Sequence, residues 1–495
     1  MLKRGAENEN IGTQKRHRGP KMNKKFKELV GNTLIFALGS LGSKLIVFLL
    51  VPLYTNLMTP SEYGTAELVF TIAQMLFPFV SVVIFESVLR YGLKNELRKE
   101  DVLLCAFVVI LFGSVLTVLF TPLFRFYPAV SNWKWYICAY VVAYMVTSVE
   151  LVYLKVRDKN KLFAFFSVLQ TLILASANIL FLAVYKKGIE GYLLSNILSH
   201  VGTAVLCALF GGVVKDLFHA RFSPALLRQM TLYSLPLIVN NISWWLIHSA
   251  DKIMIEWRLG ESELGVYTVA TKIPALVNIA AQIFSQAWGI SSIKEYDSSN
   301  DASFFSSTFK YYTFLVFLAC ILGITAVKPL LRIYVGKEYF EAWKLVPLLL
   351  VGAVFSAVSA YFSRLYSAMH KNKNVMFTTL LAAAVNIAGN FFFIGTAGTY
   401  GAAAATAVAY AVMAHIQMAD VSRFLKFDKG LPRYFLSCSL IVGQAIAATL
   451  DWHIYIVSAA AIIAFLWVNS PVIRDVICGL KKRGKSAGKN TDNRD

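Results

Sequence analysis

One lysine lies in the middle of a long apolar stretch of this sequence. Lys44 is at the midpoint of the apolar run 31–57. A lysine at the centre of a membrane-spanning helix costs roughly 2.5–3.5 kcal/mol on insertion scales, so it needs an aqueous cavity or an ionic partner. Its side chain is too short to reach either interface, roughly 15 Å away or more. We expect Lys44 to face a central aqueous cavity; a buried ion pair with a neighbouring carboxylate is the alternative.

A second group of polar and aromatic side chains lies in the apolar run 231–256. Its members recur at steps of three and four residues, which places them on one face of a helix. They are Asn241, Trp244, Trp245, His248, Asp251 and Lys252. Indole rings and amides on a membrane helix suit a sugar-binding cavity, whereas the alternative is a helix–helix interface joined by hydrogen bonds. His248 alone is equally consistent with a buried, hydrogen-bonded histidine.

The deep charges of the sequence are mainly cations. Lys272 lies about two turns inside the apolar run 265–290, where it either faces the same cavity or reaches the interface. A cavity lined by lysines attracts an anion such as a phosphate or pyrophosphate. Deep carboxylates would instead suit an exporter of organic cations.

Other charged residues lie near the ends of apolar runs. Glu86 and Arg90 are four residues apart, which predicts a local ion pair on a helix. Glu150 and Arg364 are further candidates for gates or ion pairs, and we expect them, like Glu67 and Asp420, to be structural or interfacial.

Motifs for catalysis or cofactor binding are not found in the sequence. It contains no Walker motif, no H-E-x-x-H sequence and no nucleophile elbow. The six cysteines are scattered without metal spacing, which favours packing roles. We therefore expect no enzyme activity, metal or other cofactor. The energy source stays open between coupling to H⁺ or Na⁺ through Asp251, His248 or Glu86 and substrate-driven exchange.

The elements that must position these residues are transmembrane helices. Hydrophobic residues make up 57% and charged residues 15% of the 495 residues, and apolar runs of spanning length continue along the whole chain. We predict an all-α polytopic membrane protein with about fourteen spans. The formal net charge is +20, but most Lys and Arg fall in segments on one side of the spans. This distribution places both termini in the cytoplasm and argues against nucleic-acid binding.

Three landmarks of the sequence occur twice, in the same order and about two hundred residues apart. The pairs are Ser61-Glu62-Tyr63-Gly64 with Ser262-Glu263-Leu264-Gly265, Lys159-Asn160-Lys161 with Lys371-Asn372-Lys373, and Gly188-x-x-Gly191 with Gly398-x-x-Gly401. They predict two six-helix repeats that enter the membrane in the same direction, with a substrate site between them. The expected units are a cytoplasmic tail 1–28, an N-lobe 29–213, a cytoplasmic linker 214–230, a C-lobe 231–424, two further helices in 434–470 and a cytoplasmic tail 471–495.

Several short motifs, taken together in this topology, resemble one family of transporters. They are Asn32-Thr33, Leu53-Tyr54-Thr55, Pro60-Ser61-Glu62-Tyr63-Gly64, Ala250-Asp251-Lys252, Leu264-Gly265-Val266-Tyr267 and Ala270-Thr271-Lys272-Ile273. The chain resembles the Wzx-like polysaccharide flippases of the multidrug/oligosaccharidyl-lipid/polysaccharide exporter superfamily. Relatives often carry Arg where this chain has Lys252, which keeps the charge and loses bidentate phosphate binding.

The resemblance implies two lobes around a cavity that opens alternately to each side of a bacterial plasma membrane. It implies an undecaprenyl-pyrophosphate-linked oligosaccharide as substrate, moved from the inner to the outer leaflet for surface polysaccharide synthesis. Glycan polymerases and glycosyltransferases of the same pathway would be partners. We expect the polyprenyl tail to stay in lipid or to lie along 434–470. The alternatives are a drug/cation antiporter of the same superfamily and a membrane glycan polymerase or glycosyltransferase.

Overall fold

The protein is described by a computed structural model that covers residues 42–94, 96–298 and 301–478. Within these ranges the chain folds into helices and their connections, without strands. The predicted tail 1–28, the start of the first span and the part of the tail 471–495 beyond residue 478 lie outside the described residues. The prediction of a polytopic all-α membrane protein is confirmed.

The N-terminal half forms one bundle, the N-lobe. It opens with the apolar helical segment Gly42–Leu57, whose last part is α2 (Val51–Leu57). Its other helices are α3 (Pro60–Val80), α4 (Ile84–Gly92), α5 (Lys99–Leu119), the 3₁₀ helix η1 (Thr121–Phe126), α6 (Pro128–Ser131), α7 (Lys134–Val156), α8 (Asn160–Asn178), the π-helix η2 (Ile179–Val184) and α9 (Gly188–Phe210).

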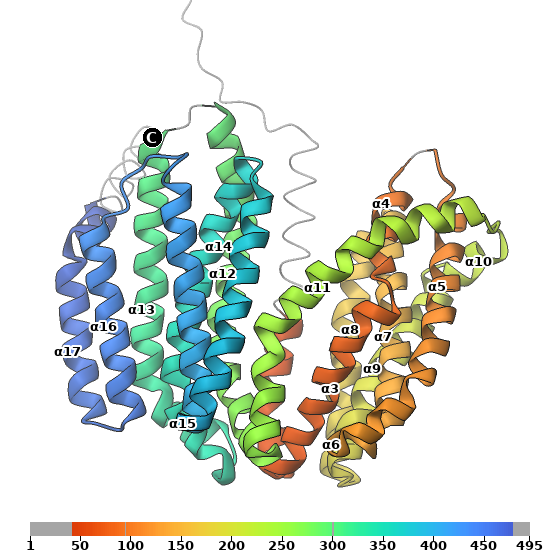
Figure 1. The fold of residues 1–495 in the computed structure, drawn as a ribbon, viewed down its shortest axis with the longest axis horizontal. Helices are drawn as coiled ribbons and strands as arrows, with labels where there is room; N and C mark the ends of the chain where they lie inside the picture. Colours follow the sequence, from red (N-terminus) through yellow and green to blue (C-terminus); the bar gives the residue numbers. More distant parts are fainter. Residues whose placement is uncertain (1–41, 95, 299–300, 479–495) are drawn as a thin grey trace, which may run out of the picture.

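The C-terminal half forms the second bundle, the C-lobe, reached through the short helix α10 (Val213–Phe218). Its helices are α11 (Pro224–Leu259), α12 (Glu261–Ser298), α13 (Ala302–Tyr334), the 3₁₀ helix η3 (Lys337–Lys344), α14 (Val346–Ala368), α15 (Asn372–Val421), α16 (Leu431–Thr449) and α17 (Ile454–Val468). In Figure 1, α16 and α17 lie at the outer edge of this lobe.

Ten described helices are long and apolar enough to cross a membrane, or eleven if the bent pair Ile454–Val468 and Ser470–Cys478 is one span. The count of fourteen therefore stays a prediction. One reason for the difference is α15, which contains two predicted spans and is interrupted only by the non-helical backbone of Gly398. Another is α11, which is absent from the ten because its many polar residues lower its hydropathy.

Helix α11 begins earlier than the sequence suggests. The Ser223 side chain accepts a hydrogen bond from the Leu226 N–H at 3.3 Å, and Pro224 occupies the first turn. Part of the predicted linker 214–230 is therefore the first two turns of α11. In Figure 1 this helix runs obliquely between the two lobes.

The doubled landmarks adopt matching conformations in the two lobes. Asp158 and His370, which precede the two Lys-Asn-Lys motifs, both have φ of 56°. The backbone then closes in the same way, with Lys159 N bonded to Leu154 O and Lys371 N bonded to Tyr366 O, both at 2.8 Å. Gly188 and Gly398 also have positive φ, 53° and 59°. The repeated residues thus end and restart helices at equivalent positions.

The two lobes meet at one end of the bundle and diverge toward the other (Figure 1). We call the end where α3 and α12 begin the turn face, and the opposite end, which carries the Lys-Asn-Lys motifs, the loop face. At the start of α3, Thr59 and Glu62 form a reciprocal capping box, with Thr59 N donating to Glu62 Oε2 at 2.8 Å. The first Ser-Glu-x-Gly motif thereby fixes where α3 begins.

Candidate functional site

The first turns of α3 and α12 contact each other directly at the turn face. A methyl group on Gly64 would lie 1.8 Å from the carbonyl oxygen of Glu261, and one on Gly265 would lie 2.0 Å from that of Pro60. The two contacts are reciprocal, as expected for repeats related by a pseudo-twofold axis. The glycines of the doubled motif therefore allow the lobes to close on each other.

A second contact closes the same end. The Gly336 N–H donates to Thr55 Oγ1 at 3.0 Å, and the Tyr339 hydroxyl donates to the carbonyl oxygen of Met58 at 3.0 Å. Both bonds join the end of the first helical segment to the connection between α13 and α14. Hydrogen bonds between the two lobes thus close the turn face together with the glycine contacts.

Just inside this closed end, a carboxylate of the N-lobe faces two lysines of the C-lobe. Glu67 on α3 pairs with Lys252 on α11 at 3.0 Å and with Lys272 on α12 at 3.4 Å. The three side chains are 11%, 19% and 23% exposed. Charges removed from water to this degree depend on one another, because removing one partner of a buried pair costs about 3–5 kcal/mol.

Tyrosines of the N-lobe surround Glu67. The Tyr192 hydroxyl donates to Glu67 Oε1 at 3.4 Å, and the ring of Tyr63 lies 5.8 Å from Lys272 Nζ. Tyr54, Tyr63 and Tyr192 also pack on one another, with ring centroids 4.8–5.8 Å apart. This aromatic shell orients the carboxylate toward the C-lobe.

Lys44 and Lys272 line one cavity between the first helical segment and α12. Its volume is about 440 Å³, and its polar side chains are Ser43, Lys44, Lys272, Asn278 and Gln282. Lys44 Nζ donates to Gln282 Oε1 at 2.5 Å across the two lobes. The structure therefore brings two of the predicted cavity lysines together, with amides beside them.

The polar stripe of α11 does not face a single surface. Trp245 Nε1 donates to the carbonyl oxygen of Thr71 at 3.1 Å, and Lys252 pairs with Glu67, so both contact α3. His248 shares a hydrogen bond of 2.8 Å with the Tyr410 hydroxyl, and Asp251 accepts one of 2.6 Å from Tyr267.

The remaining members of the stripe make fewer contacts. The Asn241 amide bonds to the carbonyl oxygen of Leu237 in its own helix. Trp244 is 45% exposed beside His248. The stripe thus joins α11 to both lobes. For Trp245, His248 and Asp251, these hydrogen bonds favour the helix–helix interface over the sugar-binding cavity.

The predicted gate residues lie apart from this site. Glu86 and Arg90 lie one turn apart on α4, and within the described chain no ion pair joins them. Glu150 is buried on α7, and its Oε2 atom has no hydrogen-bond partner among the described residues. Arg364 on α14 donates to Ser285 Oγ at 2.8 Å, inside the C-lobe.

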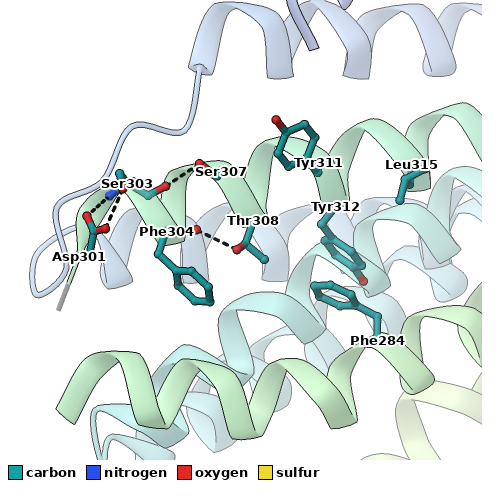
Figure 2. A pocket seen from close by; sticks show the side chains of 9 residues that line it. All are labelled: Phe284, Asp301, Ser303, Phe304, Ser307, Thr308, Tyr311, Tyr312 and Leu315. Carbon is teal, nitrogen blue, oxygen red and sulfur yellow. Dashed lines mark hydrogen bonds between the residues drawn. The ribbon is translucent and has the colours of Figure 1, made fainter. Parts of the chain in front are cut away.

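A second cavity of about 430 Å³ lies at the start of α13, toward the loop face (Figure 2). Aromatic rings of Phe284, Phe304 and Tyr312 line it beside Asp301. Asp301 caps α13 by accepting bonds from Ser303 N and Oγ, both at 2.8 Å. These bonds lower the pKa of the Asp301 carboxyl. The Asp301 carboxylate thus caps α13, and the residues that line the cavity include no Lys or Arg. We therefore do not assign this cavity to an anionic ligand.

The described part of the chain holds no group of three or more His, Cys, Asp or Glu residues arranged for a metal ion. Five of the cysteines are buried and Cys478 is exposed, all of them as free thiols. Glu67 is the main site residue that sequence reasoning placed elsewhere. The sequence predicted that Glu67 lies near the end of a span. In the structure α3 begins at Pro60, so Glu67 lies two turns inside the helix.

Comparison with known proteins places the chain in a family. It belongs to the polysaccharide biosynthesis protein family, whose profile matches residues 29–289. A protein of the Lsg locus of Haemophilus influenzae is 24% identical over 267 residues, which cover 52% of this chain and 64% of that protein. The match thus spans somewhat less than two thirds of that relative.

Solved structures with the same fold are transporters. The lipid II flippase MurJ in an inward closed conformation superposes with a TM-score of 0.68 at 14% identity, covering 90% of this chain and all of that chain. An inward-facing multidrug resistance transporter of the MATE family gives 0.60 at 15% identity, covering 76% of this chain and 98% of that chain. At these identities the likeness concerns the fold.

Proposed function

We propose that this protein is a flippase for undecaprenyl-pyrophosphate-linked oligosaccharides, which it moves from the inner to the outer leaflet of a bacterial plasma membrane. Membership of the polysaccharide biosynthesis family supports a role in that pathway. The fold shared with a lipid II flippase supports a lipid-linked substrate. Cell-surface polysaccharide biosynthesis is then the process that the protein serves.

The observation that carries the proposal is the shared cavity of Lys44 and Lys272 at the boundary of the lobes. Two ammonium groups in a partly dehydrated cavity attract a pyrophosphate. Ser43, Asn278 and Gln282 add hydrogen-bonding groups that suit sugar hydroxyls. A cavity for an organic cation would instead need carboxylates on this wall, and its lining has none.

The closed turn face supports the proposed movement from the inner to the outer leaflet. We assign this face to the outer side, because the distribution of Lys and Arg puts the loop face in the cytoplasm. The structure then corresponds to a state closed outward, in which the lysine cavity receives substrate from the cytoplasmic leaflet. Opening of the turn face and closure of the loop face would expose the glycan outside, as in alternating access.

The polyprenyl tail has an apolar surface available on α16 and α17. Ile456, Ile463 and Trp467 on α17 are 69–76% exposed. A tail lying there remains in the lipid environment while the charged head group crosses between the lobes. Membrane lipids and the glycan polymerase and glycosyltransferases of the same pathway are the proposed partners, and H⁺ or Na⁺ is the proposed coupling ion.

The test is reconstitution of the purified full-length protein into liposomes. Undecaprenyl-pyrophosphate-linked oligosaccharide is placed in both leaflets, and a glycosidase added outside digests only the outer pool. We expect the protein to make the inner pool accessible within minutes, whereas protein-free liposomes keep about half protected. If the inner pool of glycan stays protected, and the liposomes take up a cationic dye in exchange for protons moving down their gradient, the antiporter alternative would be supported instead.

A further inference from the structure

Glu67 places a negative charge beside Lys272, one of the lysines that are proposed to bind an anion. Anion transport does not by itself require a carboxylate at this point. Glu67 is an N-lobe carboxylate placed between two lysines of the C-lobe, at 3.0 and 3.4 Å. Among the described residues, these are the ion pairs that join the two lobes. The pairs lie directly inside the contact of Gly64 with α12. The charge pairing and the closure of the turn face therefore form one continuous region.

Lys272 belongs both to this region and to the cavity. Its Nζ atom pairs with Glu67, and its side chain lines the cavity with Lys44. An anion that enters the cavity thus meets a lysine whose charge is already compensated by Glu67. The anion and Glu67 must compete for the same ammonium group, because Lys272 cannot fully compensate both.

We propose that Glu67 is a built-in counter-anion that occupies the position of the substrate's pyrophosphate and is displaced by it. This inference rests on the proposed function, because it assumes an anionic substrate in the lysine cavity. When pyrophosphate takes Lys272, the ion pair of that lysine with Glu67 is lost. The closed turn face then loses one of its two ion pairs at the moment the cavity is loaded.

The same exchange resets the empty protein. After substrate leaves on the open side, Lys272 is left without an anion, and Glu67 on the opposite lobe is the carboxylate that pairs with it. Re-forming this ion pair draws α3 toward α12. Tyr192, bonded to Glu67 Oε1 at 3.4 Å, keeps the carboxylate directed at the lysines. Opening is thereby linked to a bound anion, and closure to its release.

The first test measures binding of inorganic pyrophosphate to the full-length protein in nanodiscs by calorimetry. Glu67→Gln removes the competing charge and keeps the size, so we expect binding about tenfold tighter or more. Asp451→Asn is the matched control, since it removes a carboxylate paired with Lys328 at 2.7 Å within the C-lobe and should leave the affinity unchanged. Unchanged or weaker binding to Glu67→Gln, or equal tightening in both variants, overturns the proposal.

The second test measures the distance between two spin labels at the turn face. It is made first with the wild-type site, with and without pyrophosphate, and then with Glu67→Gln. Spin labels replace Phe126 of the N-lobe and Trp452 of the C-lobe, which are 86% and 64% exposed, with the exposed Cys478 changed to serine. We expect pyrophosphate to lengthen the distance between the labels, and Glu67→Gln to lengthen it without ligand. A distance that pyrophosphate leaves unchanged contradicts the proposal, whether or not the variant folds.

These outcomes separate the inference from the proposed function. Tighter pyrophosphate binding and a longer label distance in a protein that flips no lipid-linked glycan would support the counter-anion and contradict the flippase. Flipping by a protein whose pyrophosphate affinity does not depend on Glu67 would do the reverse. Repeating the titration with undecaprenyl pyrophosphate in the nanodisc tests the lipid-borne anion, which should show the same dependence on Glu67.

Discussion

Gly64 and Gly265 stand at the crossing of the two helices that close the turn face. A Cβ atom on Gly64 would lie 2.9 Å from the backbone nitrogen of Gly265, and one on Gly265 would lie 2.0 Å from the carbonyl oxygen of Pro60. Both positions come from the same repeated motif. The lobes therefore touch through backbone atoms at equivalent points of the two repeats, and a side chain at either point has no space.

Gly265→Ala should weaken the closed turn face. The methyl group would meet the backbone of Pro60, which cannot move aside as a flexible side chain can. Overpacking of this kind costs about 1–3 kcal/mol, which shifts an equilibrium between two states by about 5–150-fold. Distance measurements between labels at 126 and 452 should therefore show a larger open population.

The control for that substitution is Gly443→Ala on α16. Nothing lies within 4 Å of a Cβ atom at this position, so the distance distribution should match that of the wild type. If Gly265→Ala leaves the distances as they are, the reciprocal glycine contact does not determine closure.

Lys252→Met should lower the stability of the protein. Glu67 would keep only its ion pair with Lys272, at 3.4 Å. We expect the free energy of unfolding to fall by about 2 kcal/mol, which is less than the cost of leaving a buried charge with no partner. Thermal unfolding in detergent measures the change. Lys328→Met, which removes a more exposed ion pair, should cost at most about 1 kcal/mol. Equal losses in the two variants would contradict the special position of Glu67.

A disulfide between positions 87 and 234 should be compatible with transport. Ser87 Oγ on α4 and Ser234 Oγ on α11 are 2.6 Å apart and fully buried, so cysteines there can bond with little movement. We expect the loop-face half of α11 to move with the N-lobe throughout the cycle. Flipping by the oxidised double-cysteine variant should therefore match that of its reduced form, whereas inhibition reversed by a reductant would show that this contact opens.

Deletion of 434–470 tests the place proposed for the polyprenyl tail. Helices α16 and α17 would be lost, and we expect flipping of a tail-bearing substrate to slow by about tenfold or more. Proteoliposomes containing the stably inserted, monodisperse variant give the measurement. A full rate would show that the tail needs no surface on these helices.

Much of the fold could be predicted from the sequence, because apolar length and repeated helix boundaries are local signals. The Lys-Asn-Lys motifs and the paired glycines mark equivalent helix ends in both lobes. One helix boundary, the start of α11, was missed. The sequence prediction assigned Pro224 to a linker, although Ser223 caps the first turn of α11 there, whereas the break at Gly398 separates the two spans predicted within α15.

The site could be predicted only in part. The midpoint position of Lys44 indicated a cavity, and Lys272 lines the same one. Glu67 was not predicted as a partner, because its distance along the chain from Lys252 and Lys272 hides their contact. Nor could spacing alone divide the stripe of α11, since Trp245 and Lys252 find partners on α3 whereas His248 and Asp251 find tyrosines of the C-lobe.

The central claim is that an anionic lipid-linked glycan crosses the membrane through the lysine cavity. Its most direct test is the flipping rate of undecaprenyl-pyrophosphate-linked oligosaccharide in proteoliposomes that carry Lys44→Met, compared with Lys44→Arg and with Lys328→Met outside the cavity. We predict a loss of about tenfold or more in Lys44→Met, recovery of most of the rate in Lys44→Arg, and no change in Lys328→Met. A wild-type rate in Lys44→Met would contradict the account.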